Sequence, residues 1–297
     1  MRSRSAQQPV GLQRSGDNVH WMSWQWPVGG ACGFLIALVT TPAGVSGAAL
    51  LLPVQLSVLG VPSPAVTPTN LLFNVVAVPG GLLRFWSERR LLGPLSGLLV
   101  AGTLPGVVVG AIVRVEYLSG SGAFMFIAAG VLMPLGLWLL LGSQRVAPSR
   151  PEPGPRGRGL IAFLALGVGV VGGIYGIGGG SLLAPVLIAS GFSAYEVAPA
   201  TLLATFLTSI VGIATFVVLQ ASHGGSIAPE WILGVSMGFG GFLGSYAGAR
   251  LQSRVPEASL RRLLGLVACL VAARYTQAAV QQSSRPARPV PARAATR

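Results

Sequence analysis

Four short polar side chains lie at matching positions in the two halves of the chain, inside segments that are otherwise apolar. Asn70 and Asn74 in the first half match Thr201 and Thr205 in the second, at an offset of 131. Residues four apart share one face of a helix. Amide and hydroxyl groups donate hydrogen bonds, so this set can coordinate a dehydrated anion. The alternative is that the four side chains only bond packed membrane helices to one another.

A glycine-rich motif that ends in proline occurs once in each half, 132 positions apart. The first copy runs from Gly44 to Val54 as GVSGAALLLPV, and the second runs from Gly176 to Val186 as GIGGGSLLAPV. Each copy interrupts a long apolar run. Irregular backbone is tolerated inside a membrane only where it is buried in protein or lines a polar cavity. Two broken segments at corresponding positions therefore indicate a transporter's binding site.

The glycines would shape the backbone of this site. The half-helices that follow them would direct unpaired N–H groups and the positive end of a helix dipole at an anion. The predicted substrate-binding residues are Gly44, Gly47, Asn70, Asn74, Gly178, Gly179, Gly180, Thr201 and Thr205.

The alternative role for glycines in a membrane is close helix packing. Packing better explains Gly106 and Gly110, and also Gly240, Gly244 and Gly248, because these glycines recur every four residues without polar neighbours.

The composition places the chain in a membrane. Of its 297 residues, 52% are hydrophobic and 9% are charged, with a mean hydropathy of +0.69, whereas a soluble domain is about 25% charged. The net charge of +13 comes from arginines in loops and tails. We therefore expect anionic lipid headgroups as partners, and no nucleic acid.

The sequence has no pattern typical of an enzyme, a metal centre or a cofactor site. Cys32 and Cys269 lie in apolar segments, and His20 and His223 are far apart. The run from Gly176 to Gly180 lacks the preceding strand and the following lysine of a nucleotide-binding loop. All seven acidic residues fall in loops, tails or span edges, so no carboxylate is placed for a proton relay in mid-membrane.

Ten apolar segments follow a polar start that contains several tryptophans. They are 28–41, 47–60, 65–83, 91–113, 122–142, 159–174, 180–190, 196–220, 230–249 and 259–280. Those of about 18 residues or more are long enough to cross a membrane as helices. The segments beside the glycine motifs are individually too short. Each pair is expected to form one bent span or a hairpin that begins and ends on the same side.

Three internal segments hold most of the arginines, namely 84–90, 145–158 and 250–262. If all three are cytoplasmic, an even number of crossings must separate 145–158 from 250–262. Segments 196–220 and 230–249 supply two crossings, so 159–190 must be a hairpin that returns to its own side. By the repeat, 28–60 is expected to be a hairpin too. The halves then have opposite orientations and both termini lie outside. Eight plain crossings with the termini inside would explain the basic tails but misplace 250–262. We favour the hairpins because short loops follow the charge rule best.

The predicted fold is an all-α polytopic membrane protein of two pseudo-symmetric repeats, each with a Gly-broken helical hairpin plus three spanning helices. The predicted divisions are a polar and aromatic segment at 1–27, a first repeat at 28–142, a Pro/Arg-rich linker at 143–158, a second repeat at 159–280 and a disordered basic tail at 281–297.

These features resemble the sulfite exporter TauE/SafE-type permeases, which are built from four plus four segments. The resemblance rests on the doubled glycine motif, on the Pro-x-x-Leu-Leu elements at 68–72 and 199–203, and on the basic segment between the halves. It covers about residues 28–280. The second motif is very close to the family pattern, whereas the first has Ser46 and Ala48 where glycine is usual.

The resemblance implies a multi-pass carrier in the bacterial plasma membrane, with sulfite or an organosulfur anion as its substrate. Two other classes would use the same residues. A channel-like uniporter would pass another small anion without coupling, and a structural membrane protein would use the polar face for packing alone. The sequence carries no signal for the oligomeric state.

Overall fold

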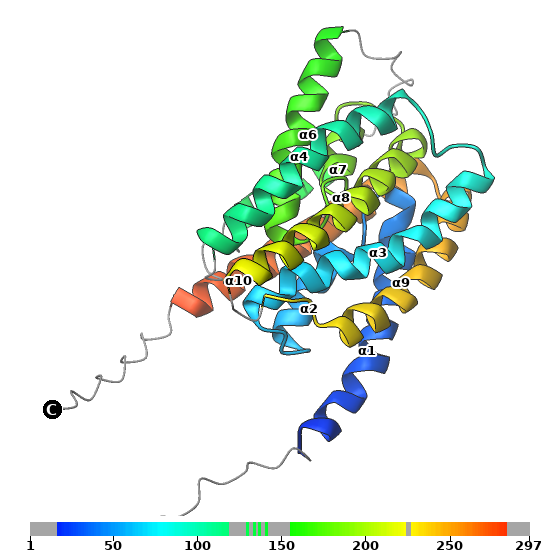
Figure 1. Ribbon diagram of the computed structural model, residues 1–297. Helices are drawn as coiled ribbons and strands as arrows, with labels where there is room; N and C mark the ends of the chain where they lie inside the picture. The colour runs from blue at the N-terminus through cyan, green and yellow to red at the C-terminus, as the bar shows by residue number, and fades with distance from the viewer. Residues whose placement is uncertain are drawn as a thin grey trace, which may run out of the picture.

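The computed structural model describes residues 17–118, 155–223 and 227–283, together with 129–130, 133–134, 136–137 and 140–141. Regular structure in this part of the chain is helical throughout (Figure 1). The elements are α1 (Asp17–Thr40), η1 (Thr41–Ala43), α2 (Ala48–Ser57), α3 (Ser63–Ser87), α4 (Pro94–Glu116), α6 (Pro155–Tyr175), α7 (Leu183–Ala189), α8 (Ala194–His223), α9 (Trp231–Leu251), η2 (Gln252–Arg254) and α10 (Glu257–Ser283).

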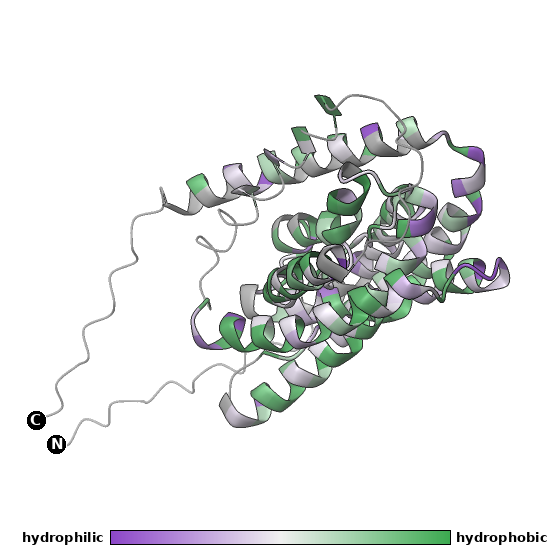
Figure 2. Ribbon diagram, turned by 90° about the horizontal axis from the view of Figure 1, so that it is seen from above, coloured by the Kyte–Doolittle hydropathy of each residue, from purple (hydrophilic) through white to green (hydrophobic). Residues whose placement is uncertain are grey.

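Within the described residues, six helical segments are long and apolar enough to cross a membrane. They are Trp24–Ala43, Ala65–Ser87, Pro94–Glu116, Gly157–Tyr175, Ala194–Ser222 and Trp231–Arg254. Their outer faces expose large apolar side chains such as Val109, Phe163 and Val218, and Figure 2 shows hydrophobic residues along these helices. Such faces suit a lipid environment. The prediction of an all-α polytopic membrane protein is confirmed.

The expectation that 28–41 and 159–174 are too short to span a membrane is wrong. Helix α1 begins at Asp17 and α6 begins at Pro155, and both contain a candidate span. An apolar run marks only the part of a helix that lies in hydrocarbon, and the helix continues through the interface. Proline is also accepted in the first turn of a helix, because the N–H that it lacks would have no partner within the helix there. Each broken segment is thus a full-length helix followed by a short one, α2 or α7.

The last predicted segment of each half has a different outcome. Helix α10 covers the segment predicted at 259–280, and it packs on both short helices, α2 and α7. Most of 122–142, of the linker at 143–158 and of the tail at 281–297 lies outside the described residues. Three spanning helices in each half therefore remain a prediction, as do the repeat and the division into segments.

The helix before the first glycine motif packs in parallel on a glycine-lined helix of the second half. Helix α1 runs along α9, and an added Cβ at Gly240, Gly244 or Gly248 would collide with the carbonyl oxygens of Gly30, Phe34 and Leu38 in turn. Glycine at these positions lets the two backbones touch. The packing interpretation of Gly240, Gly244 and Gly248 is confirmed.

The helix before the second motif packs in the same way on the first half. Helix α6 runs along α4, where Gly102, Gly106 and Gly110 leave no room for a Cβ against α6. The carbonyls that they approach, those of Ala162, Leu166 and Val170, follow Gly30, Phe34 and Leu38 by the same 132 positions that separate the glycine motifs. The packing role predicted for Gly106 and Gly110 is also confirmed. In each half, the helix that precedes the glycine motif, α1 or α6, therefore packs on the other half. We call α1 and α6 the leading helices.

The hairpin formed by α1 and α2 begins and ends at one end of the bundle. Gln25 Nε2, near the start of α1, donates to the carbonyl of Leu59 beyond α2 at 3.3 Å. Glu230 N donates to Thr69 Oγ1 at 2.8 Å at the same end. We call this end, defined by these four residues, the distal end.

The hairpin formed by α6 and α7 begins and ends at the opposite end. Arg158, at the start of α6, and Phe192, beyond α7, line one cavity there together with Arg90. In Figure 1, α1 accordingly begins at the bottom of the view and α6 at the top. We call the end that carries Arg84–Arg90, Arg158 and Arg250–Arg254 the basic end.

We expect Gly244→Ile to lower the stability of the folded protein by about 1–3 kcal/mol, because overpacking a tight contact forces backbones apart. The measurement is the thermal unfolding midpoint in detergent. The matched control is Gly167→Ile, since Gly167 also lies within a helix but has nothing within 4 Å of an added Cβ. Equal midpoints for the two variants would contradict the packing role.

Candidate functional site

Both glycine motifs are buried inside the bundle. Every residue of 40–49 and of 175–185 is buried. Gly44, Gly176 and Gly178 adopt φ values of 77°, 69° and 74°, a backbone conformation that glycine reaches without steric cost. These positive φ values end the leading helix and turn the chain toward α2 or α7. The motifs therefore place broken backbone where protein, and not lipid, surrounds it.

The first motif is tied to the second half by Thr201. Its Oγ1 lies 2.9 Å from the carbonyl oxygen of Gly44 and 2.9 Å from that of Val197, one turn earlier in α8. An added Cβ at Gly44 would collide with Ala198 and Thr201. The Thr201 hydroxyl proton is therefore directed at backbone carbonyls, and this predicted ligand residue holds the break in place.

A contact in the opposite direction joins Asn74 of the first half to the second motif. Asn74 Nδ2 donates to the carbonyl of Gly176 over a long 3.5 Å. The other amide atom, Oδ1, is buried and has no hydrogen-bond partner among the described residues. Buried polar atoms are normally paired. Asn74 can therefore accept a further hydrogen bond through Oδ1 beside the second break.

Three buried hydroxyls connect the two motifs directly. Ser181 Oγ donates to Ser46 Oγ at 2.8 Å, and it lies 3.2 Å from Thr205 Oγ1. Ser46 Oγ donates in turn to the carbonyl of Ile177, and Ser46 N donates to Ser181 Oγ, both at 3.3 Å. Of these three residues, only Thr205 is among the predicted site residues. The signal for Ser46 was its departure from the family's glycine, because a hydroxyl there can reach the other half.

Asn70 and Gly47 serve the first half alone. Asn70 Nδ2 donates to the carbonyl of Ala48 at 2.8 Å, and its Oδ1 accepts from Gln55 Nε2 at 2.9 Å. An added Cβ at Gly47 would meet Ile36 and Phe73. The structure therefore does not bring these two predicted residues to the second motif. Gln55 is not among the predicted site residues, although a single amide side chain in an apolar helix indicates a buried hydrogen bond, here the one to Asn70.

The three predicted glycines of the second motif lie at close range to atoms of neighbouring helices. An added Cβ would strike the Thr201 carbonyl at Gly180, Thr205 at Gly178 and Thr103 at Gly179. Gly179 N donates to Thr208 Oγ1 at 3.0 Å. These glycines are needed for close approach as well as for the turn.

Ser209 is a second polar residue with unused capacity beside the second motif. It is buried, its Oγ has no hydrogen-bond partner in the described part of the chain, and it lies 3.2 Å from the position of an added Cβ at Gly178. Ser209 is not among the predicted site residues, although it continues the polar face of α8 by one turn after Thr205.

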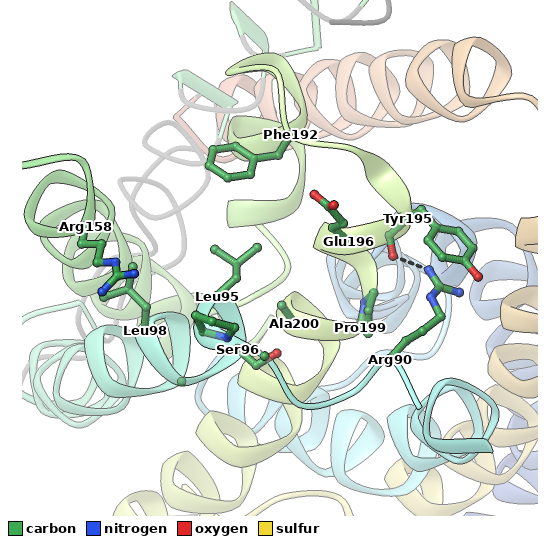
Figure 3. Close-up of a pocket in the computed structure, with 13 residues that line it drawn as sticks. Arg90, Leu95, Ser96, Leu98, Arg158, Phe192, Tyr195, Glu196, Pro199 and Ala200 are labelled. Carbon is green, nitrogen blue, oxygen red and sulfur yellow. Dashed lines mark hydrogen bonds between the residues drawn. The ribbon is translucent and has the colours of Figure 1, made fainter. Parts of the chain in front are cut away.

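A cavity of about 750 Å³ lies at the basic end (Figure 3). Side chains from α4, from the start of α6 and from α8 line it, with Arg158 and Glu196 among them. Pro199 and Ala200 also line it and directly precede Thr201. The cavity thus reaches within one residue of the contact between α8 and the first motif. Within the described residues, no group of three or more His, Cys, Asp or Glu side chains could hold a metal ion.

Comparison with known proteins places the chain among membrane transporters. The family described as sulfite exporter TauE/SafE matches residues 29–275, a range that includes both motifs. The chain is similar to the probable membrane transporter protein YunE of Bacillus subtilis (strain 168), with 28% identity over 193 residues that cover 59% of this chain and 68% of that protein. No solved structure matches the chain. The protein is a multi-pass transporter of the plasma membrane and not an enzyme, and its chain belongs to the sulfite exporter TauE/SafE family.

Proposed function

We propose that the protein is a permease of the bacterial plasma membrane for a small anion, with sulfite or an organosulfur anion as the substrate. The single observation that carries this proposal is the hydroxyl chain of Ser46, Ser181 and Thr205, which joins two broken helices in the buried centre of the bundle. Facing broken helices of this kind form the substrate sites of many transporters.

The backbone donors of the two motifs suit an oxyanion. Ser46 N donates to the Ser181 hydroxyl and Gly179 N donates to the Thr208 hydroxyl, so both N–H groups are satisfied by neutral oxygens. A charged oxygen accepts a stronger hydrogen bond than a hydroxyl does. A sulfite or sulfonate oxygen could therefore displace these hydroxyls without leaving a donor unpaired.

The first turn of α2 supplies further positive potential. Helix α2 starts at Ala48, and the first N–H groups of a helix have no acceptor in a preceding turn. They carry the positive end of the helix dipole, which favours a nearby anion.

The nine predicted site residues then divide by role. Gly44, Gly47, Gly178, Gly179 and Gly180 shape the backbone, Thr201 and Asn70 hold it, and Thr205 and Asn74 contact the anion together with Ser209.

The arrangement of the two hairpins supports a carrier mechanism. They open at opposite ends of the bundle and meet in its centre, as expected of two halves with inverted orientation. Rocking or gating one half against the other would expose the central site to each side in turn. Anionic lipid headgroups would bind the arginines of the basic end.

Purified protein in proteoliposomes is expected to carry a saturable sulfite flux, with sulfate and taurine as competing anions to define the substrate class. Gly179→Leu should reduce this flux at least tenfold, because its side chain would occupy the space of Thr103 beside the motif. Gly167→Leu is the control, since nothing lies within 4 Å of a Cβ at Gly167.

The form of the flux separates the candidate functions. Flux that rises linearly with concentration would favour a channel-like uniporter over a carrier. Folded wild-type protein that moves none of the tested anions would contradict the sulfur-anion assignment.

Thr205→Val tests the hydroxyl chain without a change in volume. We expect the KM of anion flux to rise about tenfold or more, because a hydrogen bond to a charged group contributes about 1.5–3 kcal/mol. Thr215→Val is the matched control, since the Thr215 hydroxyl lies on the same helix and donates to the carbonyl of Val211 one turn earlier. Equal KM values for both variants would remove Thr205 from the site.

A further inference from the structure

Gln252 holds the residues just before the first glycine motif in place at the basic end. This buried residue follows α9, and its Nε2 donates to the carbonyl of Pro42 at 2.7 Å and to that of Ala194 at 3.2 Å. Pro42 lies two residues before Gly44, and Ala194 begins α8. One amide group therefore ties the first motif to the second half.

Arg90 extends this contact toward the cavity. Its Nη2 donates to Gln252 Oε1 at 3.2 Å and to the carbonyl of Tyr195, and its Nη1 donates to Glu88 Oε2 at 2.8 Å. Figure 3 shows the bond between Arg90 and Tyr195 at the edge of the cavity. Arg90 and Tyr195 line the cavity, whereas Gln252 and Pro42 do not. The network therefore joins the lining of the cavity to the residues just before the first motif.

Arg114 occupies the corresponding place at the second motif. Gly110 and Gly248 make matching backbone contacts with α6 and α1, and Arg114 and Gln252 each follow four residues later. The buried Arg114 Nε donates to Thr67 Oγ1 at 3.3 Å, and Thr67 Oγ1 donates to the carbonyl of Ile174 at 3.1 Å. Ile174 lies two residues before Gly176, as Pro42 lies two before Gly44.

We infer that Gln252 and Arg114 are positioning residues that keep the central site closed at opposite ends of the bundle. Gln252 holds the first glycine motif at the basic end, and Arg114 holds the second at the distal end. Release of Gln252 removes the link between Pro42, before the first motif, and Ala194, at the start of α8, and so opens the central site to the cavity at the basic end. Release of Arg114 removes the bond that holds Thr67 Oγ1 in place against the carbonyl of Ile174, and so opens the site toward the distal end. The inference rests on the proposed function, because it assigns to each residue the control of one side of the transport path.

The test is side-specific labelling of a buried cysteine by a membrane-impermeant maleimide, in proteoliposomes without added substrate. The background is Cys32→Ala with Cys269→Ala, and the reporter is Ala198→Cys, because Ala198 is fully buried against Gly44. A separate Ser253→Cys protein, with its cysteine exposed beside Gln252, identifies the side on which the basic end lies.

Gln252→Leu is expected to raise the labelling rate of the reporter at least tenfold from the basic end and to leave it unchanged from the distal end. Ser236→Ala is the matched control. Its hydroxyl also joins α9 to a carbonyl of α1, that of Trp26, but far from the motif. If Gln252→Leu does not fold, Gln252→Glu replaces it, since a carboxylate keeps the shape and the bond to Arg90 but cannot donate to Pro42.

The reciprocal arm uses Ile177→Cys, which lies in the second motif. Arg114→Gln is expected to raise its labelling from the distal end and not from the basic end. An unchanged rate in folded Gln252 variants, or an equal rise from both sides, would overturn the inference. Labelling needs no transport, so this result and the sulfite flux can fail independently.

Discussion

The structure depends on one constraint, which is that broken backbone inside a membrane must find its hydrogen bonds within the protein. The chain breaks a helix at Gly44 and again at Gly176, and both breaks are enclosed by the opposite half. Thr201 satisfies the carbonyl of the first break and Asn74 approaches that of the second. Neither half could shelter its own break alone. The interface between the two halves therefore encloses both breaks.

The glycine stripes of α4 and α9 make this enclosure possible. By allowing backbone contact along α6 and α1, they bring each leading helix close enough for its terminal motif to reach the other half. A side chain on either stripe would separate the helices and lift the motif away from α8 or α3. Packing glycines and motif glycines thus act together, although they differ in conformation: the motifs require positive φ, whereas the stripes require only the absence of a Cβ.

The sequence predicted the helical segments, the two breaks and the packing role of the glycine stripes, because these features appear as local patterns. It predicted the start of α1 poorly, since the polar residues before Trp24 continue a helix that no apolar run marks. It also could not show that Thr201 and Asn70 bind backbone carbonyls while Ser46 and Ser181 face each other. Those partners lie far apart along the chain, and only the packing of the two halves decides between ligand contact and structural contact. Gln252 and Arg114 escaped notice for the same reason, because each looks like an ordinary polar residue at a helix end.

The exchange of leading helices has a consequence for how the protein is made. Helix α1 is synthesised well before α9, the helix against which it packs. Until α8 is also made, the carbonyl of Gly44 lacks Thr201. A first half without the second would therefore have the broken backbone at Gly44 without this hydrogen bond. The packing of α1 on α9 therefore forms only after the intervening helices have been made.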